Sequence, residues 1–171
     1  RIELGDRTLI MGILNATPDS FSDGGRFLDY SSAVNRGFEL IAAGADILDI
    51  GGESTRPGSD SVPVDLELER VVPVIRAIRE RSNIPISIDT NKSEVARQAL
   101  FAGADIINDV SSLRFDPEMA EVVARSGAPL IIMHMLGTPR TMQKNPVYSS
   151  LISEIIAFLE ERLQFAVSRG I

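Results

Sequence analysis

The sequence predicts an α/β fold, a (β/α)8 TIM barrel of which these 171 residues hold the first five βα units. Short apolar runs alternate with amphipathic segments, a pattern typical of a parallel sheet with helical crossovers. The pentapeptide Ala-Gly-Ala-Asp-Ile occurs at 43–47 and again at 102–106, with a weaker copy at 127–129. The expected strand ends lie roughly 30 residues apart, so eight units need roughly 240 residues, close to the ~250 of a complete barrel. We therefore expect one domain, residues 1–171, that stops before a sixth strand.

Each expected strand is a short, predominantly apolar run without the alternation of a half-exposed strand, as in strands that are buried on both faces. The runs are 9–14, 45–50, 86–88, 105–110 and 130–133. Residues with capping chemistry bound the helices between them. We expect the first helix to begin at Ser31 or Ser32 and to end at Gly44. The fourth should be capped by Asp116, with Pro117 in its first position.

Polar residues gather where the expected strands end. They are Asn15, Asp49, Glu53, Asp89, Asn108, Asp109 and His134. In a barrel the carboxyl ends of the strands converge on the catalytic face. An amide and a carboxylate inside an apolar strand, as at Asn108 and Asp109, cost free energy unless they are hydrogen-bonded, which favours a function for this pair. Plainer roles stay open for single residues: a turn at Asn15, a helix cap at Asp89 and a structural ring at His134.

Composition excludes several classes of function. The chain has no cysteine, which excludes disulfides and thiolate chemistry, and its single histidine disfavours a zinc site. Any metal is therefore expected to be a hard cation with oxygen ligands. A net charge of −7 without a basic cluster disfavours nucleic acid as a partner. No run of about eighteen apolar residues could span a membrane, and the first residues lack a signal-peptide core, so we expect a cytoplasmic protein with no membrane partner.

The first strand leads into an unusually long polar loop. It ends at Asn15 and is followed by short polar residues with Pro18, Gly24 and Gly25. A strand-to-helix loop of about fifteen residues exceeds the usual two to six, and loops of that length are commonly functional. We interpret this loop as part of a ligand site.

Five motifs stand at the expected strand ends. They are Met-Gly-Ile-Leu-Asn-Ala-Thr-Pro-Asp-Ser-Phe-Ser-Asp-Gly-Gly at 11–25, Asp-Ile-Gly-Gly-Glu-Ser-Thr-Arg-Pro-Gly at 49–58, Ile-Asp-Thr at 88–90, Ile-Asn-Asp at 107–109 and Met-His-Met-Leu-Gly-Thr-Pro at 133–139. In this order and at this spacing they resemble the motifs of dihydropteroate synthase, over essentially the whole chain. The resemblance implies a (β/α)8 barrel that joins 6-hydroxymethyl-7,8-dihydropterin pyrophosphate to p-aminobenzoate in folate biosynthesis and releases pyrophosphate. It also implies that sulfonamides compete for the p-aminobenzoate site.

The resemblance further implies a role for residues at four strand ends. Asn15 matches a ligand of Mg²⁺ and of the pyrophosphate group, and Mg²⁺ prefers oxygen ligands. Asp89 and Asn108 match residues that hydrogen-bond the pterin edge, where N–H donors and ring-nitrogen acceptors lie side by side. Met133 matches an apolar wall of the pterin pocket.

Two loops match the p-aminobenzoate pocket of that family. The matching residues are Thr55, Arg56 and Pro57 after the second strand, with Phe21 and Asp23 after the first. The resemblance gives Thr55, Arg56 and Asp23 a catalytic role, because they match groups that steady the cationic carbon as pyrophosphate leaves. A solvated loop charge stays open as the plainer interpretation of Arg56.

The later motifs of the family, which supply a lysine and the basic residues for pyrophosphate, would follow Ile171. We therefore expect these 171 residues alone to be inactive. The resemblance also implies that the full-length protein is a homodimer. Two alternatives remain. One is an inactive pterin-binding half-barrel of the same family. The other is a glycosidase barrel whose paired carboxylates would come from Asp49, Glu53, Asp89 and Asp109, which the absence of tryptophan and the presence of only two tyrosines for sugar stacking disfavour.

Overall fold

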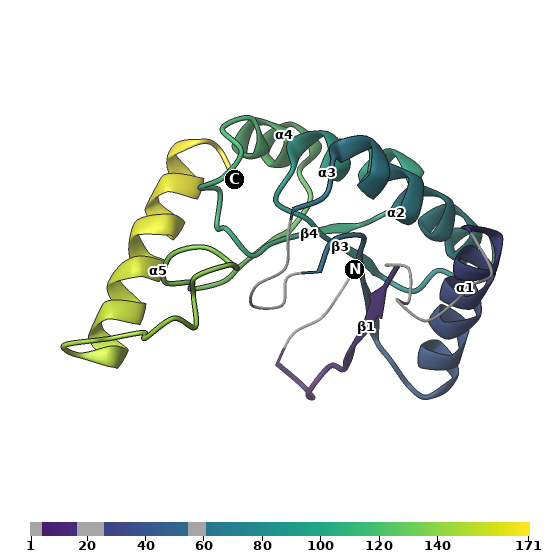
Figure 1. The fold of residues 1–171 in the computed structure, drawn as a ribbon, viewed down its shortest axis with the longest axis horizontal. Helices are drawn as coiled ribbons and strands as arrows, with labels where there is room; N and C mark the ends of the chain where they lie inside the picture. Colours follow the sequence, from purple (N-terminus) through teal and green to yellow (C-terminus); the bar gives the residue numbers. More distant parts are fainter. Residues whose placement is uncertain (1–4, 17–25, 55–60) are drawn as a thin grey trace.

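The computed structural model describes residues 5–16, 26–54 and 61–171. Within these ranges five strands form one parallel sheet in the order β1-β2-β3-β4-β5. The strands are β1 Met11–Asn15, β2 Ile47–Gly51, β3 Ile86–Asp89, β4 Ile106–Asp109 and β5 Leu130–Ile132. The helices are α1 Arg26–Ala42, α2 Val64–Arg79, α3 Ser93–Ala102, α4 Met119–Ser126 and α5 Leu151–Ser168. The five βα units expected from the sequence are confirmed (Figure 1).

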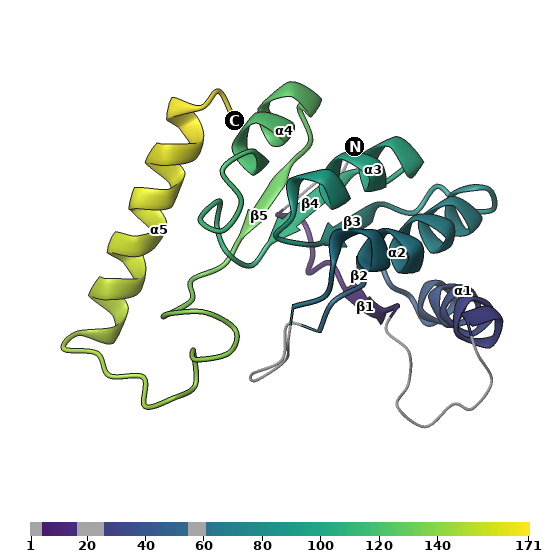
Figure 2. The same ribbon diagram turned by 45° about the horizontal axis from the view of Figure 1, so that its top comes forward.

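The sheet has one face covered by helices and one open face. Successive side chains of a strand point to opposite faces. Leu14, Ile50, Ile88 and Ile107 stand in register on the covered face and are at most 2% exposed. Figure 2 shows helices α1 to α4 along this face, with α5 beyond β5. On the other face, which no helix of the described residues covers, Ile13 of edge strand β1 is 66% exposed, whereas Asp49 and Ser87 nearer the middle of the sheet are buried. The core therefore lies between the sheet and the helices.

Two helices begin at other residues than the sequence suggested. α1 begins at Arg26 rather than at a serine, because no proline or glycine between 26 and 36 prevents it from extending toward its amino end. α4 begins at Met119, after Pro117. Asp116 nevertheless holds the turn before the helix, since its Oδ1 accepts the Glu118 N–H at 2.9 Å and its carbonyl oxygen accepts the Met119 N–H at 3.2 Å.

The second copy of the repeated pentapeptide fastens the amino ends of β3 and β4. Gly103 ends α3 with a φ of +116°, and a Cβ at this position would lie 2.9 Å from Arg79 Cγ. Asp105 Oδ2 then accepts the Ile86 N–H at 2.9 Å and pairs with Arg79 Nη2 at 2.5 Å. The glycine ends the helix and the carboxylate fixes the next strand.

The first copy does the same at the amino ends of β1 and β2. Gly44 has a φ of +98° just after α1. Asp46 Oδ2 accepts the Ile10 N–H at 2.8 Å, and the same carboxylate pairs with Arg7. The repeat therefore has a structural role at the amino ends of the strands, and the predicted site lies at their carboxyl ends.

Candidate active site

Three predicted site residues share one level of the sheet at the carboxyl ends of the strands. Asn15 is in register with Gly51, Gly51 with Asp89, and Asp89 with Asn108. Side chains in register on parallel neighbours point to the same face, here the open one. Gly51 has no side chain, so only backbone lies between Asn15 and Asp89 on this face; a Cβ here would be in ordinary contact with Asp89 Cβ, at 3.5 Å. The structure thus brings the expected amides and carboxylate together around a floor of backbone.

Asp89 is a half-buried acid that pairs with no cation among the described residues. Its Oδ1 is buried and has no hydrogen-bond partner among the described residues. The pKa of Asp89 is raised to about 7, first by burial and then by the negative charges of Asp49, Glu67, Asp109 and Glu53. A carboxyl group in this state titrates near neutral pH and is available to a ligand that donates N–H groups.

Asn108 is held by a second buried acid, Asp49. Asn108 Nδ2 donates to Asp49 Oδ2 at 3.2 Å. Asp49 is 6% exposed, and burial raises the pKa of its carboxyl group, while neighbouring Ser87 and Asn108 lower it. Asp49 Oδ1 and Ser87 Oγ are buried and make no hydrogen bond of normal geometry in the described part of the chain, although the Ser87 hydroxyl lies close enough to the carboxyl group to lower its pKa. Such unpaired buried polar atoms are uncommon in a purely structural setting.

Asp109, in contrast, has its hydrogen bonds satisfied. Its Oδ1 accepts the Ser111 N–H at 2.8 Å and its Oδ2 accepts the Leu113 N–H at 2.7 Å. Ser112 and Leu113 both have positive φ, 55° and 63°, a conformation that is rare for residues other than glycine. Asp109 therefore holds a strained loop after β4, and of the Asn-Asp pair only Asn108 reaches the open face.

That loop also holds Met133. Ser112 Oγ donates to the Met133 carbonyl oxygen at 2.7 Å and accepts the Met133 N–H at 3.0 Å. Ile131 is in register with Asn108, and Met133 follows β5 directly. Met133 is 37% exposed, so part of its apolar side chain is accessible.

His134 takes the structural role that its position suggested. Its ring packs edge-on against Phe158 of α5, with ring centroids 5.0 Å apart, and lies 6.0 Å from the ring of Tyr148. These contacts hold the chain after β5 against the last helix.

An ionic network that the sequence did not suggest supports the strand ends. Lys92 Nζ donates to Glu53 Oε2 at 2.5 Å and also pairs with Glu67, whose Oε1 accepts the Thr90 hydroxyl at 2.7 Å. Glu53 Oε2 in addition accepts the Val62 N–H at 2.9 Å. The network joins the ends of β2 and β3 to the first turn of α2. No local pattern in the sequence pairs Lys92 with acids 25 and 39 residues away.

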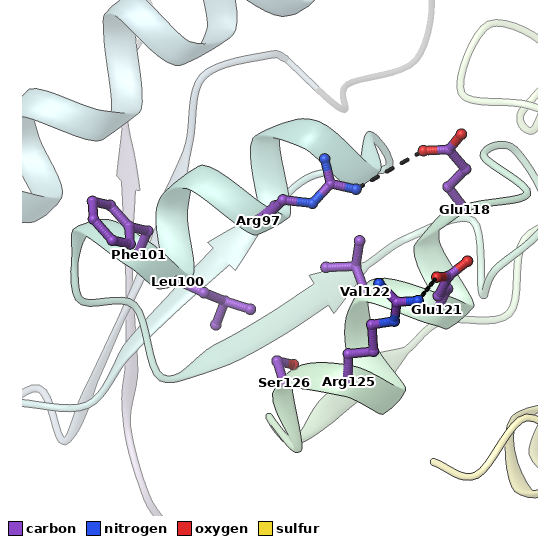
Figure 3. A pocket seen from close by; sticks show the side chains of 8 residues that line it. All are labelled: Arg97, Leu100, Phe101, Glu118, Glu121, Val122, Arg125 and Ser126. Atoms are coloured by element: carbon purple, nitrogen blue, oxygen red, sulfur yellow. Dashed lines mark ion pairs between the residues drawn. The ribbon is translucent and has the colours of Figure 1, made fainter.

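A hollow lies on the helix layer, between α3 and α4 and away from the strand ends (Figure 3). It is lined by Arg97, Leu100, Phe101, Glu118, Glu121, Val122, Arg125 and Ser126. Its charges pair with one another: Arg97 Nη2 lies 3.9 Å from Glu118 Oε2, and Arg125 Nη2 lies 2.6 Å from Glu121 Oε1. Because these charges are paired and the hollow is remote from the strand ends, we assign it no ligand.

The remaining predicted residues lie outside the described ranges. They are Phe21, Asp23, Thr55, Arg56 and Pro57. Within those ranges no group of three or more histidines and acidic residues could hold a metal ion. No helix there has the length and apolar character needed to cross a membrane.

Comparison with known proteins gives a consistent result. Residues 11–171 match the family described as pterin binding enzyme. A dihydropteroate synthase of Synechocystis sp. is 50% identical over 167 residues, which make up 98% of this chain and 58% of that protein. The Escherichia coli dihydropteroate synthase is 47% identical over 162 residues, 95% of this chain and 57% of that protein. The chain thus spans less than two thirds of the length of these relatives.

Solved structures that resemble this chain are also dihydropteroate synthases. The Yersinia pestis dihydropteroate synthase, in a complex with a sulfonamide drug, superposes with a TM-score of 0.89 at 44% identity, and the match covers 96% of this chain and 60% of that one. The Xanthomonas albilineans dihydropteroate synthase with 4-aminobenzoic acid gives a TM-score of 0.88 at 48% identity, covering 97% and 58%. These neighbours support the barrel expected from the strand spacing.

Proposed function

This chain belongs to the pterin-binding enzyme family, and from that premise we propose that the protein is a dihydropteroate synthase. This transferase of folate biosynthesis breaks the bond between the 6-methylene carbon of the pterin and pyrophosphate, and forms a bond from that carbon to the amino nitrogen of p-aminobenzoate, which loses a proton. Relatives at 47 to 50% identity that carry this name support the proposal.

The observation that carries the proposal is that Asn15, Asp89 and Asn108 lie in register at the carboxyl ends of their strands and face the same side of the sheet. A pterin edge offers N–H donors, and a buried carboxylate beside a fixed amide can accept them. Met133 would close one side of the pterin pocket. In a neighbour with 43% identity, the Xanthomonas albilineans synthase, 7,8-dihydropteroate is bound, so a ligand of this class fits this fold.

For magnesium, the residues present fit a cation that arrives with its substrate. Asn15 is exposed at the end of β1, and the described residues build no resident metal cage around it. Mg²⁺ is commonly held by one or two protein oxygens together with substrate phosphates and water. Asn15 would supply one amide oxygen, and the ion would offset charge on the departing pyrophosphate.

The p-aminobenzoate pocket would be formed by Phe21, Thr55, Arg56 and Pro57. Thr55, Arg56 and Asp23 would steady the carbon as pyrophosphate leaves, and closure of their loops would keep water from it. Sulfonamide binding at this pocket is expected on the same grounds. The cytoplasmic location and the homodimer expected from the sequence stay predictions.

The alternatives are less well supported. Of the four carboxylates that a glycosidase could use, Asp109 is occupied by backbone N–H groups and Glu53 by Lys92 and Val62, which leaves Asp49 and Asp89. The absence of tryptophan for sugar stacking and the match to the pterin binding enzyme family disfavour a sugar substrate for this pair. An inactive pterin-binding half-barrel remains distinguishable by assay. We expect residues 1–171 alone to give no dihydropteroate from the two substrates, and the full-length protein to give it. Turnover by the isolated 171 residues at an ordinary enzyme rate would place the catalytic groups in this part of the chain and contradict our assignment.

The role of Asn15 has a separate test. Asn15→Ala should weaken the magnesium-dependent binding of the pterin pyrophosphate and leave the binding of the bare pterin nearly unchanged, as measured by calorimetry. Equal losses for both ligands would move Asn15 from the metal site to the pterin site.

A further inference from the structure

A side-chain hydrogen bond joins two strands that are not neighbours. Asn108 Nδ2 on β4 donates to Asp49 Oδ2 on β2 at 3.2 Å, although β3 lies between these strands. The residue of β3 that is in register with Asp49 is Ser87, whose side chain is small and fully buried. A larger residue at this position would occupy the space through which the two side chains meet.

This bond decides which end of the Asn108 amide faces the ligand. A carboxylate only accepts hydrogen bonds, so Asn108 must turn its NH2 group toward Asp49. Its carbonyl oxygen Oδ1 is left over. Among the described residues no group donates to that oxygen, and Asn108 stands in register with Asp89 on the open face.

Asp49 is poorly explained as a stabilising residue. Its side chain is buried, its Oδ1 has no hydrogen bond of normal geometry in the described part of the chain, and Lys92, the cation at the strand ends, bonds to Glu53 and Glu67 instead. Burying a carboxyl group in this way opposes folding. A group that is retained against such a cost at a strand end points to function.

We propose that Asp49 is a positioning residue that fixes the Asn108 amide with its oxygen toward the open face, and thereby selects ligands that donate hydrogen bonds at that edge. The proposal rests on the proposed function and adds a specificity rule to it. With Asn108 Oδ1 and the Asp89 carboxylate both accepting, the site favours an aminopyrimidine edge. A ring that carries a carbonyl oxygen in place of the amino group would set two acceptors against each other.

The test compares two ligands, pterin and lumazine, in which the 2-amino group of pterin is replaced by an oxygen. Calorimetry on the full-length wild-type protein should show pterin bound roughly 10- to 100-fold more tightly. In Asp49→Leu the Asn108 amide is free to turn, and the ratio of the two affinities should fall to within about threefold. Asp49→Asn keeps the volume of the side chain, and because an amide both donates and accepts hydrogen bonds, it can hold the Asn108 amide in either orientation. The ratio of pterin affinity to lumazine affinity in this variant should therefore lie between those of the wild type and Asp49→Leu.

The ratio separates positioning from structural damage, because a loosened pocket weakens both ligands together. Asp105→Asn is the matched control, since Asp105 also links β3 and β4 but at their amino ends. Its ratio should equal that of the wild type. A wild-type protein that binds neither ring would overturn the proposed function and this inference with it. A wild-type preference for pterin that survives unchanged in both Asp49 variants would overturn the inference alone.

Discussion

The two ends of the sheet carry carboxylates in opposite states. At the amino ends Asp46 and Asp105 each pair with an arginine and accept a backbone N–H, and the pKa of Asp46 is lowered to about 2, first by the hydrogen bond from Arg7 and then by the Ile10 N–H. At the carboxyl ends Asp49 and Asp89 each keep a buried oxygen without a partner in the described part of the chain, and their pKa values are raised.

Asp46 and Asp49 are only three residues apart, so the difference comes from surroundings rather than from residue type. The amino ends use their acids to fasten strands, and every acceptor there serves the fold. The carboxyl ends leave acceptors unused, which is favourable only if a ligand fills them. Substitutions at each end of the strands test whether the two sets of carboxylates serve different purposes.

The largest effect is expected at Lys92, the cation beneath the carboxyl ends. Its side chain is 15% exposed and that of Glu67 is 1% exposed, so Lys92→Met leaves a buried carboxylate without its counterion. We expect a loss of about 3 to 5 kcal/mol in the free energy of unfolding, measured by urea titration at pH 7. Arg125→Met is the control, because its pair with Glu121 is exposed and should contribute no more than about 0.5 kcal/mol. Similar losses in both variants would contradict the buried network.

The next effect concerns ligand binding. Asp89→Ala removes one buried acceptor and should weaken pterin binding by about 1 to 3 kcal/mol, or roughly 5- to 150-fold, by calorimetry on the full-length protein. Asp105→Ala removes a carboxylate from the opposite end of neighbouring strand β4 and should leave the affinity unchanged. If the two variants lose affinity equally, the two ends of the sheet do not differ in function.

The sequence was sufficient to predict which polar residues meet at the carboxyl ends of the strands, because those ends are marked by local signals. Polar residues that interrupt or close apolar runs, such as Asn15, Asp89 and Asn108, can be recognised one strand at a time. The strand order follows from the βα repeat, and the structure confirms it.

The supporting contacts could not be predicted in the same way. The bond from Asn108 to Asp49 joins residues 59 positions apart, and the pairing of Lys92 with Glu53 and Glu67 depends on how α2 packs against the sheet. Ser112 donates one hydrogen bond to Met133 and accepts another from it, and its backbone has a positive φ. Nothing in the sequence around a serine indicates that conformation. Long-range side-chain pairs and strained backbone follow from the packed fold, not from periodicity.

A third prediction concerns pH at the carboxyl ends. Ligand N–H groups bind the ionised form of Asp89. Because the pKa of Asp89 is about 7, a fraction of the protein molecules carries a protonated Asp89 near neutral pH and must release this proton before the ligand binds. Affinity for pterin should therefore fall by up to about tenfold for each pH unit below 7 and level off above it. Calorimetry between pH 5.5 and about 8.5 gives the profile. Asp49→Asn removes the largest of the charges that raise this pKa, so its profile should move to lower pH, and an unmoved profile would contradict the coupling.

The smallest effect is expected at the amino ends. Asp46 has a lowered pKa in the folded protein, so its ionised form stabilises the fold above pH ~4, and this contribution is lost as the pH falls through about 2. Asp46→Asn should lower the urea midpoint slightly at pH 7, leave pterin affinity unchanged, and flatten the decline in stability between pH 4 and 2. Added salt should shrink the difference at pH 7, because Arg7 is exposed and its charge is screened. A change in pterin affinity without a change in acid stability would mean that Asp46 serves the site rather than the strands.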